Sequence, residues 1–148
     1  MANQPIGKLD HIGIAVKNIA EARKFFEEIL GASFLYEHNN PEAGYKIAEF
    51  DFNGMVLELL EPLGDDSFLH GFLEKRGEGV HHLTIDVPDS KERIEELKKA
   101  GVKIASEREF PESYEAFLSP RSSHGVLIQI GSGYPTLARA AEWFKRKD

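Results

Sequence analysis

The sequence predicts a single α+β domain of 148 residues, built from two βαβββ modules that follow one another along the chain. The modules span residues 8–62 and 80–131. A connector with a short helix covers 63–79, and a further helix is expected within 132–148. Two observations lead to this prediction. Both halves of the chain carry strand, helix and turn signals in the same order, and short motifs recur 71 residues apart. Recurrence at a fixed spacing indicates a duplicated structural unit.

The first module opens with a strand over residues 8–16, in which His11 and small residues alternate with apolar side chains. A helix follows, because Asn18 fits an N-cap with Glu21 three positions later, and Gly31 fits the glycine that ends a helix. The buried face expected for this helix consists of Ala22, Phe25, Phe26 and Ile29. Strands are predicted over residues 32–36, 45–52 and 55–60, with turns at 38–41 and at Asn53-Gly54, a pair typical of hairpins.

The second module repeats this order, with a strand over 80–87 and a helix from the N-cap Asp89 to Gly101. Further strands are predicted over 102–106, 114–118 and 125–130. The connector helix is expected over 68–75. A C-terminal amphipathic helix over 136–147 is expected to pack on the domain or on a second copy in a homodimer.

Composition excludes several classes of protein. The net charge of −7 argues against nucleic acid as the main partner, because binding to phosphates needs clustered Lys and Arg. No apolar run approaches the roughly 18 residues of a membrane span, and the polar start lacks the apolar core of a signal peptide. We therefore expect no membrane partner and a cytoplasmic location. Since the chain has no cysteine, a bound metal would need His, carboxylate or amide ligands.

The repeated motifs place ligand-type residues inside apolar strands. His11 in LDHIGIAV matches His82 in VHHLTIDV, and Glu58 in NGMVLELL matches Gln129 in HGVLIQIG. A buried polar group is costly unless it has a partner, and a cation is one way to satisfy a carboxylate. His11, Glu58, His82 and Gln129 are therefore predicted to bind one divalent metal ion. Zn²⁺, Co²⁺, Ni²⁺, Mn²⁺ and Fe²⁺ all suit these donors, and the sequence does not choose among them.

Four stretches of the chain resemble a known family: LDHIGIAVKNIAEARKFFEEILGA, LELLEPLGDDS, FLEKRGEGVHHLTIDV and SPRSSHGVLIQI. They are similar to the methylmalonyl-CoA epimerase branch of the glyoxalase/vicinal-oxygen-chelate superfamily, over about residues 9–130. The resemblance implies an incompletely closed, eight-stranded, barrel-like sheet around one divalent metal. It also implies that the metal ligands are His11, Glu58, His82 and Gln129.

One departure from the family pattern affects the chemistry. The family's GVLIEL reads GVLIQI here, so Gln129 stands where relatives carry a glutamate that is implicated in proton transfer. An amide cannot act as the base. We therefore expect the acid/base pair to be Glu49 and Glu115, which lie in equivalent strands of the two modules where relatives are usually apolar. Glu49 shares a face with Ile47, near the position where some epimerases place a catalytic glutamate.

The first expectation for function is a metal-dependent isomerase that moves the α-proton of a small-molecule substrate such as an acyl-CoA. The runner-up is a glyoxalase-type lyase, similar to lactoylglutathione lyase, or another metalloenzyme of the superfamily. The third alternative is a metal-free ligand-binding protein of the same fold.

Overall fold

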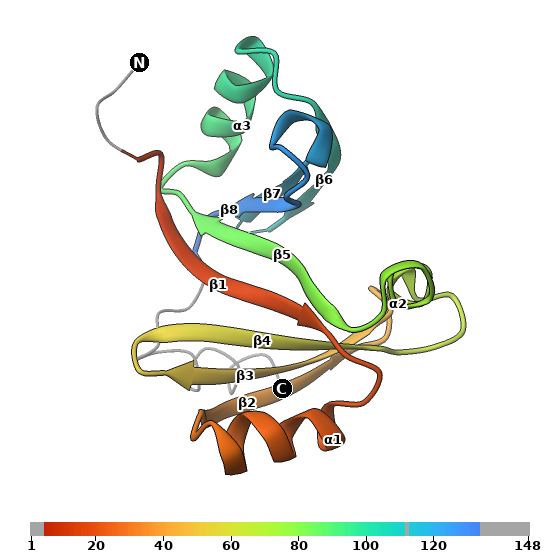
Figure 1. Ribbon diagram of the computed structural model, residues 1–148. Helices are drawn as coiled ribbons and strands as arrows, with labels where there is room; N and C mark the ends of the chain where they lie inside the picture. The colour runs from red at the N-terminus through yellow and green to blue at the C-terminus, as the bar shows by residue number, and fades with distance from the viewer. Residues whose placement is uncertain (1–4, 112, 134–148) are drawn as a thin grey trace. The chain divides into compact units, whose positions relative to one another are not determined.

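The structure is a computed structural model that describes residues 5–111 and 113–133 (Figure 1). Hydrogen bonds link its strands into an open, mixed, eight-stranded sheet with the order β2-β3-β4-β1-β5-β8-β7-β6. This confirms the predicted α+β class. The described residues form two compact units, an N-terminal unit of residues 12–81 and a C-terminal unit of residues 5–11 and 82–133. Strands β1 (Lys8–Ala15) and β5 (Gly79–Asp86) each contribute residues to both units.

The N-terminal unit contains the antiparallel strands β2 (Ser33–Asn40), β3 (Tyr45–Phe52) and β4 (Met55–Pro62), with β3 in the middle. The helices of this unit are α1 (Ile19–Arg23), η1 (Lys24–Ile29) and α2 (Phe68–Arg76). Because side chains alternate along a strand, the sheet buries a cluster on each face. One cluster consists of Val16, Ile19, Ala32, Ala48, Phe50 and Leu59, and the other of Ala15, Tyr36, Ile47, Leu60 and Leu69.

The first helix begins as predicted, since the Asn18 side chain accepts a hydrogen bond from the backbone N–H of Glu21 at 2.9 Å. Its predicted buried face is partly wrong, because Ile29 is 71% exposed and Phe25 is about half exposed. Residues 24–29 adopt a π-helix, in which the Leu30 N–H bonds the Phe25 carbonyl five residues back. A π-turn holds more residues than an α-turn, so the side chains rotate out of the α-helical register used for the prediction.

Strands β2 and β6 extend furthest beyond the ends that the sequence predicted. Strand β2 continues to Asn40, so residues 38–40 pair with β3 where a turn was expected. Strand β6 (Ile104–Phe110) likewise extends beyond residue 106 along β7 (Ser113–Leu118). In both cases pairing with a neighbouring strand overrides weak local preference. The Asn53-Gly54 turn is confirmed, with φ values of 55° and 102° that suit this pair.

In the C-terminal unit, β8 (Ile128–Gly131) runs parallel to β5 and antiparallel to β7. A short 3₁₀ helix, η2 (Pro120–Ser122), precedes β8. Helix α3 (Ser90–Lys99) packs on one face of these strands, where the buried cluster consists of Val87, Ile94, Ala116, Leu118 and Ile130. Alternation places the residues between them on the opposite face, which carries polar side chains. That polar face contains most of the residues predicted to form the site.

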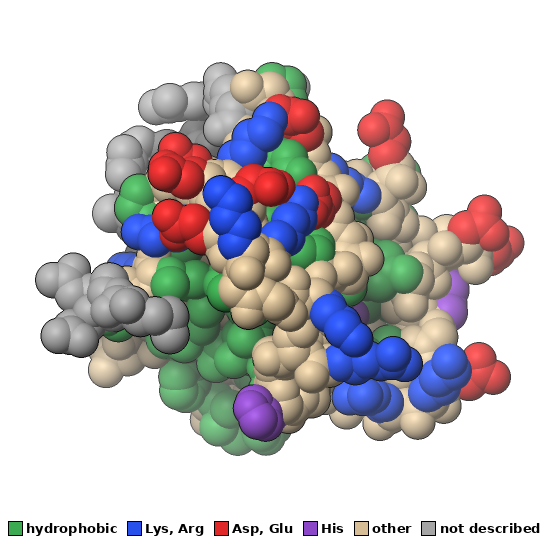
Figure 2. Space-filling model, turned by 90° about the horizontal axis from the view of Figure 1, so that it is seen from above, with side chains coloured by type: hydrophobic (Ala, Val, Ile, Leu, Met, Phe, Trp, Pro, Cys, Tyr) green, Lys and Arg blue, Asp and Glu red, His purple; other side chains and the backbone are tan. Residues whose placement is uncertain are grey.

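Helix α3 has the predicted N-cap, since the Asp89 side chain accepts from the Glu92 N–H at 3.1 Å. Its surface carries ion pairs such as Arg93–Glu96 and Lys98–Glu95, and charged side chains of both signs share the face drawn in Figure 2. Exposed pairs of this kind contribute little to stability. None of the helices in residues 5–111 and 113–133 has the length and hydropathy needed to cross a membrane. The C-terminal helix predicted over 136–147 lies outside the described residues.

Candidate metal centre

His11 lies on β1 and is only 4% exposed. Its Nδ1 is 2.7 Å from Oδ2 of Asp10, and its Nε2 is 2.9 Å from Oγ1 of Thr84. A carboxylate on one ring nitrogen of a histidine fixes the orientation of the ring and directs the other nitrogen toward a ligand. Asp10 therefore orients His11 so that Nε2 faces the polar side of the C-terminal unit.

His82 lies on β5, also 4% exposed, with its ring centroid 5.6 Å from that of His11. Phe117 packs edge-on against the other side of the His82 ring, at 5.7 Å between centroids. Side chains two apart share a face of a strand, so His82 and Thr84 project together. The structure thus places the two repeated histidines side by side, each held between neighbours.

Thr84 was missed by the sequence prediction, although it is fully buried and bonds two of the predicted ligands. The signal was present, because Thr84 stands two residues after His82 within an apolar strand. The position 71 residues earlier is Gly13, so the first module has no corresponding hydroxyl. Comparison of the repeats for differences, in addition to matches, would have identified it.

Gln129 lies on β8, directly across from Thr84 on β5 and from Phe117 on β7. Its amide oxygen accepts a hydrogen bond from Thr84 Oγ1 at 2.8 Å, and its amide nitrogen donates to Oε2 of Glu115 at 3.0 Å. His11, Thr84, Gln129 and Glu115 therefore form one continuous chain of contacts. The predicted ligand Gln129 and the predicted acid/base residue Glu115 are direct partners in it.

The N-terminal unit holds the two remaining predicted residues on adjacent strands. Glu58 on β4 and Glu49 on β3 are both buried, and they stand directly opposite each other in the antiparallel register. Both belong to the face of the sheet that also carries Ile47 and Leu60. Two buried carboxylates at one register position need compensation from their surroundings, and a cation is one group that would supply it.

The C-terminal unit supplies the imidazoles of His11 and His82, and the N-terminal unit supplies the carboxylate of Glu58. All three side chains are buried. Two imidazole nitrogens and a carboxylate oxygen are donors that suit Zn²⁺, Co²⁺, Ni²⁺, Mn²⁺ and Fe²⁺. The residues present are thus compatible with one divalent metal ion, and His11 has the carboxylate partner typical of metal-binding histidines.

His81, the neighbour of His82 in the sequence, belongs to a different environment. Its ring packs against Phe72 and Phe68 of α2, at centroid distances of 4.9 and 5.7 Å. Burial, and secondarily the positive charge of Arg76, lower the pKa of His81 below its ordinary value. This placement agrees with the alternation of β5, which directs His81 away from the face that carries His82.

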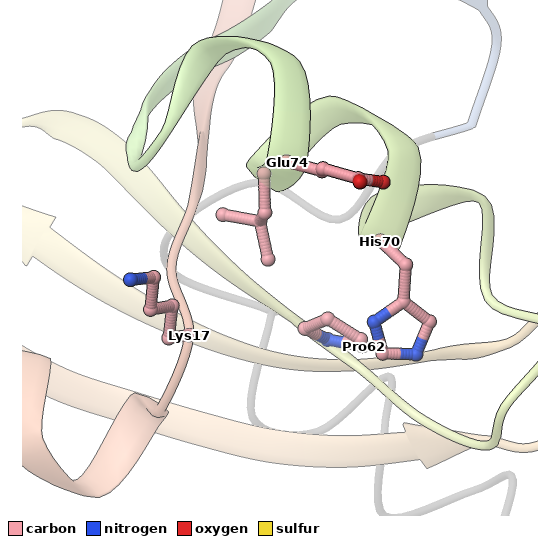
Figure 3. A pocket seen from close by; sticks show the side chains of 5 residues that line it. Lys17, Pro62, His70 and Glu74 are labelled. Atoms are coloured by element: carbon pink, nitrogen blue, oxygen red, sulfur yellow. The ribbon is translucent and has the colours of Figure 1, made fainter.

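A surface pocket of about 470 Å³ lies elsewhere in the N-terminal unit. It is lined by Lys17, Pro62, His70, Leu73 and Glu74, four of which are labelled in Figure 3. None of the predicted site residues lines it. Lys17 and Glu74 are its one lysine and one carboxylate, so its charge does not favour an anionic ligand.

Comparison with known proteins places this architecture in a family. The model of the Glyoxalase/Bleomycin resistance protein/Dioxygenase superfamily matches residues 10–117. The uncharacterized protein YqjC of Bacillus subtilis is 38% identical over 130 residues, which are 84% of this chain and 91% of YqjC. The mitochondrial methylmalonyl-CoA epimerase of Bos taurus is 33% identical over 129 residues, covering 84% of this chain and 74% of the epimerase.

A solved structure of a Streptomyces coelicolor methylmalonyl-CoA epimerase variant, in complex with 2-nitronate-propionyl-CoA, is also similar. The two structures match with a TM-score of 0.78 and 29% identity, over 88% of this chain and 99% of the epimerase. The resemblance seen in the sequence motifs is therefore confirmed at the level of family and fold. This chain belongs to the glyoxalase/bleomycin resistance protein/dioxygenase superfamily and has its vicinal-oxygen-chelate fold.

Proposed function

We propose that this protein is a metal-dependent isomerase that moves the α-proton of an acyl-CoA thioester resembling methylmalonyl-CoA. The observation that carries the proposal is the adjacent buried pair His11 and His82 in the C-terminal unit, together with the buried Glu58, in a chain that is similar to methylmalonyl-CoA epimerases. Because those relatives are epimerases, an isomerase is preferred to a glyoxalase-type lyase.

The proposed ligands of the ion are His11, Glu58, His82 and Gln129. A divalent cation in such a site supplies Lewis-acid stabilisation of negative charge that develops on a substrate oxygen. Gln129 offers a neutral oxygen and cannot accept a proton. The proton transfers therefore fall to other groups of the chain.

Glu49 and Glu115 are the proposed acid/base pair. One of the pair, as a carboxylate, takes the α-proton as the C–H bond breaks, and the other, as a carboxylic acid, donates its proton to the opposite face of the resulting planar enolate. Glu49 is buried on β3 opposite Glu58, and Glu115 is half-buried on β7 beside Gln129. The position of Glu49 beside the proposed ligand Glu58, and of Glu115 beside the proposed ligand Gln129, supports the assignment.

The test is exchange of the α-proton of methylmalonyl-CoA in deuterated water, followed by NMR. We expect exchange that is abolished by a chelator and restored by added Co²⁺, and that falls at least 100-fold in Glu49→Gln, a loss typical of general acid/base residues. Glu109→Gln is the matched control, because Glu109 is an exposed carboxylate on β6 whose partner is Lys91. Wild-type exchange rates in both Glu49→Gln and Glu115→Gln would show that the acid/base assignment is wrong.

Metal content separates this proposal from the binding-protein alternative. Protein purified without chelator is expected to contain about one divalent ion per chain by elemental analysis. A protein that binds acyl-CoA without any metal and without proton exchange would instead be a ligand-binding member of the superfamily.

A further inference from the structure

An amide ligand poses a problem that a carboxylate ligand does not. The two ends of the Gln129 side-chain amide are similar in size, but only the oxygen can donate an electron pair to a cation, since the NH₂ group is a hydrogen-bond donor. The terminal torsion of a glutamine is broad and roughly two-fold, so the side chain by itself does not choose which end faces the site. Its neighbours must make that choice.

Glu115 makes the choice at one end of the amide. Its Oε2 lies 3.0 Å from Gln129 Nε2, and an ionised carboxylate can only accept hydrogen bonds. Turning the amide over would place its oxygen against the carboxylate, with two acceptors in contact and no proton between them. When Glu115 is ionised, the bond that does form joins a neutral donor to a charged acceptor, and such bonds are stronger than neutral ones.

Thr84 holds the other end of the amide, although its hydroxyl can donate or accept and so leaves the choice of end to Glu115. Its hydroxyl donates to Gln129 Oε1 at 2.8 Å, and the same oxygen atom of Thr84 lies 2.9 Å from Nε2 of His11. The amide oxygen is thereby held on the side of His11. Thr84 is completely buried, so water does not compete for this bond.

The strand registers explain why these residues meet. Thr84 pairs with Gln129 across β5 and β8, and Phe117 pairs with Gln129 across β8 and β7. Glu115 stands two residues before Phe117 and therefore shares its face of β7. All of these contacts lie within the C-terminal unit.

We propose that Glu115 and Thr84 are positioning residues that hold the Gln129 amide with its oxygen toward His11 and so make Gln129 an oxygen ligand. This inference rests on the proposed metal site. It assigns to Glu115 a role beyond proton transfer, and to Thr84 a role that the motifs did not suggest. One carboxylate oxygen, Oε2, is sufficient for the positioning role of Glu115.

A double-mutant cycle tests the role of Glu115, with the Co²⁺ dissociation constant measured by absorbance titration. Glu115→Ala is expected to weaken Co²⁺ binding by about 10- to 100-fold, the range for groups that orient a metal ligand. Glu115→Gln should retain most of the affinity, because its carbonyl oxygen still accepts from the Gln129 NH₂ group. In the Gln129→Glu background the Glu115→Ala change should not weaken binding, because a carboxylate presents an oxygen at either end.

Two results would overturn the proposal. Equal weakening by Glu115→Ala in both backgrounds would mean that Glu115 acts through its charge or through the fold. A loss in Glu115→Gln as large as that in Glu115→Ala would mean that the hydrogen bond is not what matters. Glu109→Ala serves as the control, since it removes an exposed carboxylate from the strand next to β7.

A second readout keeps the orientation testable even if the protein binds no metal. The chain has two glutamines, Gln4 and Gln129, so the Gln129 side-chain NH₂ signals can be assigned in ¹⁵N NMR spectra by their loss in Gln129→Glu. In metal-free protein these signals should shift in Glu115→Ala while the backbone spectrum stays folded. Unmoved signals would refute the positioning role. Shifted signals without Co²⁺ binding would instead refute the proposed metal site and leave the orientation intact.

Discussion

Replacement of Thr84 by valine tests whether the hydrogen-bonded chain of the candidate site exists in the folded protein. Valine has nearly the same shape as threonine, so Thr84→Val removes the hydroxyl and leaves the packing of a fully buried side chain almost unchanged. The hydroxyl contacts Nε2 of His11 at 2.9 Å and donates to Oε1 of Gln129 at 2.8 Å. The variant loses both contacts together.

The two partners differ in what the loss costs. Gln129 is half-buried, so water can replace the hydroxyl at its oxygen. His11 is 4% exposed, so its Nε2 loses this partner in a place that water does not easily reach. A buried polar atom that loses its partner costs about 1–3 kcal/mol, so we expect Thr84→Val to lower the free energy of unfolding by about 2 kcal/mol. For a chain of this size that corresponds to a fall in Tm of roughly 4–8 °C.

The assay is urea unfolding followed by circular dichroism in the presence of EDTA. Thr84→Ser is the companion variant, because it keeps the hydroxyl and removes one buried methyl group, at an expected cost of about 1 kcal/mol. Valine should therefore be the more harmful of the two replacements. A Thr84→Val protein as stable as the wild type would refute the reasoning, since it would mean that His11 and Gln129 do not depend on the hydroxyl.

Two further predictions concern packing and pH. Ile94 is fully buried in the cluster under α3, so Ile94→Ala should lower the free energy of unfolding by about 2–5 kcal/mol in urea titrations. Ile29 is 71% exposed, so Ile29→Ala should change the free energy of unfolding by no more than about 0.5 kcal/mol. Similar losses at both positions would contradict the assignment of the core. The pKa of His81 is lowered in the folded state, so the unfolded chain binds the proton of this histidine more readily than the folded protein does. The contribution of the neutral ring to the free energy of unfolding is therefore complete above pH 6.5. It is lost as the pH falls from 6.5 through the folded-state pKa. His81→Phe should therefore flatten the decrease in unfolding free energy of the metal-free protein below pH 6.5. His124→Asn, at an exposed residue with φ of 56°, should leave the decrease unchanged.

Most of the secondary structure was predictable because its signals are local. Asn18 and Asp89 cap helices through side-chain bonds to backbone groups three residues later, and the Asn53-Gly54 turn depends on the positive φ that both residues tolerate. The strand alternation that buries His11 and His82 is likewise a property of each strand alone. The repeat then identified these two positions as related, without any knowledge of what lies between them.

The elements that were mispredicted depend on partners distant in the sequence. Residues 38–40 become strand because β3 supplies hydrogen-bond partners for them, and no local signal records that pairing. The helix over 24–29 winds as a π-helix, which exposes Ile29 although its spacing suits a buried α-helical face. Local patterns describe preferences of a segment, whereas these outcomes depend on what the folded chain places beside it.

The fold family and the residue types of the candidate site could be read from the chain alone, because alternation, caps and repeated motifs act over short distances. Which of those residues contact one another depends on the assembled sheet. Glu115 and Gln129 are 14 positions apart, and Thr84 and His11 are 73 apart, yet strand registers bring each pair within hydrogen-bonding distance. Register is set by the whole sheet, and a slip of one residue would turn each side chain to the opposite face. The orientation of the Gln129 amide is therefore a property of the assembled sheet that no single segment specifies.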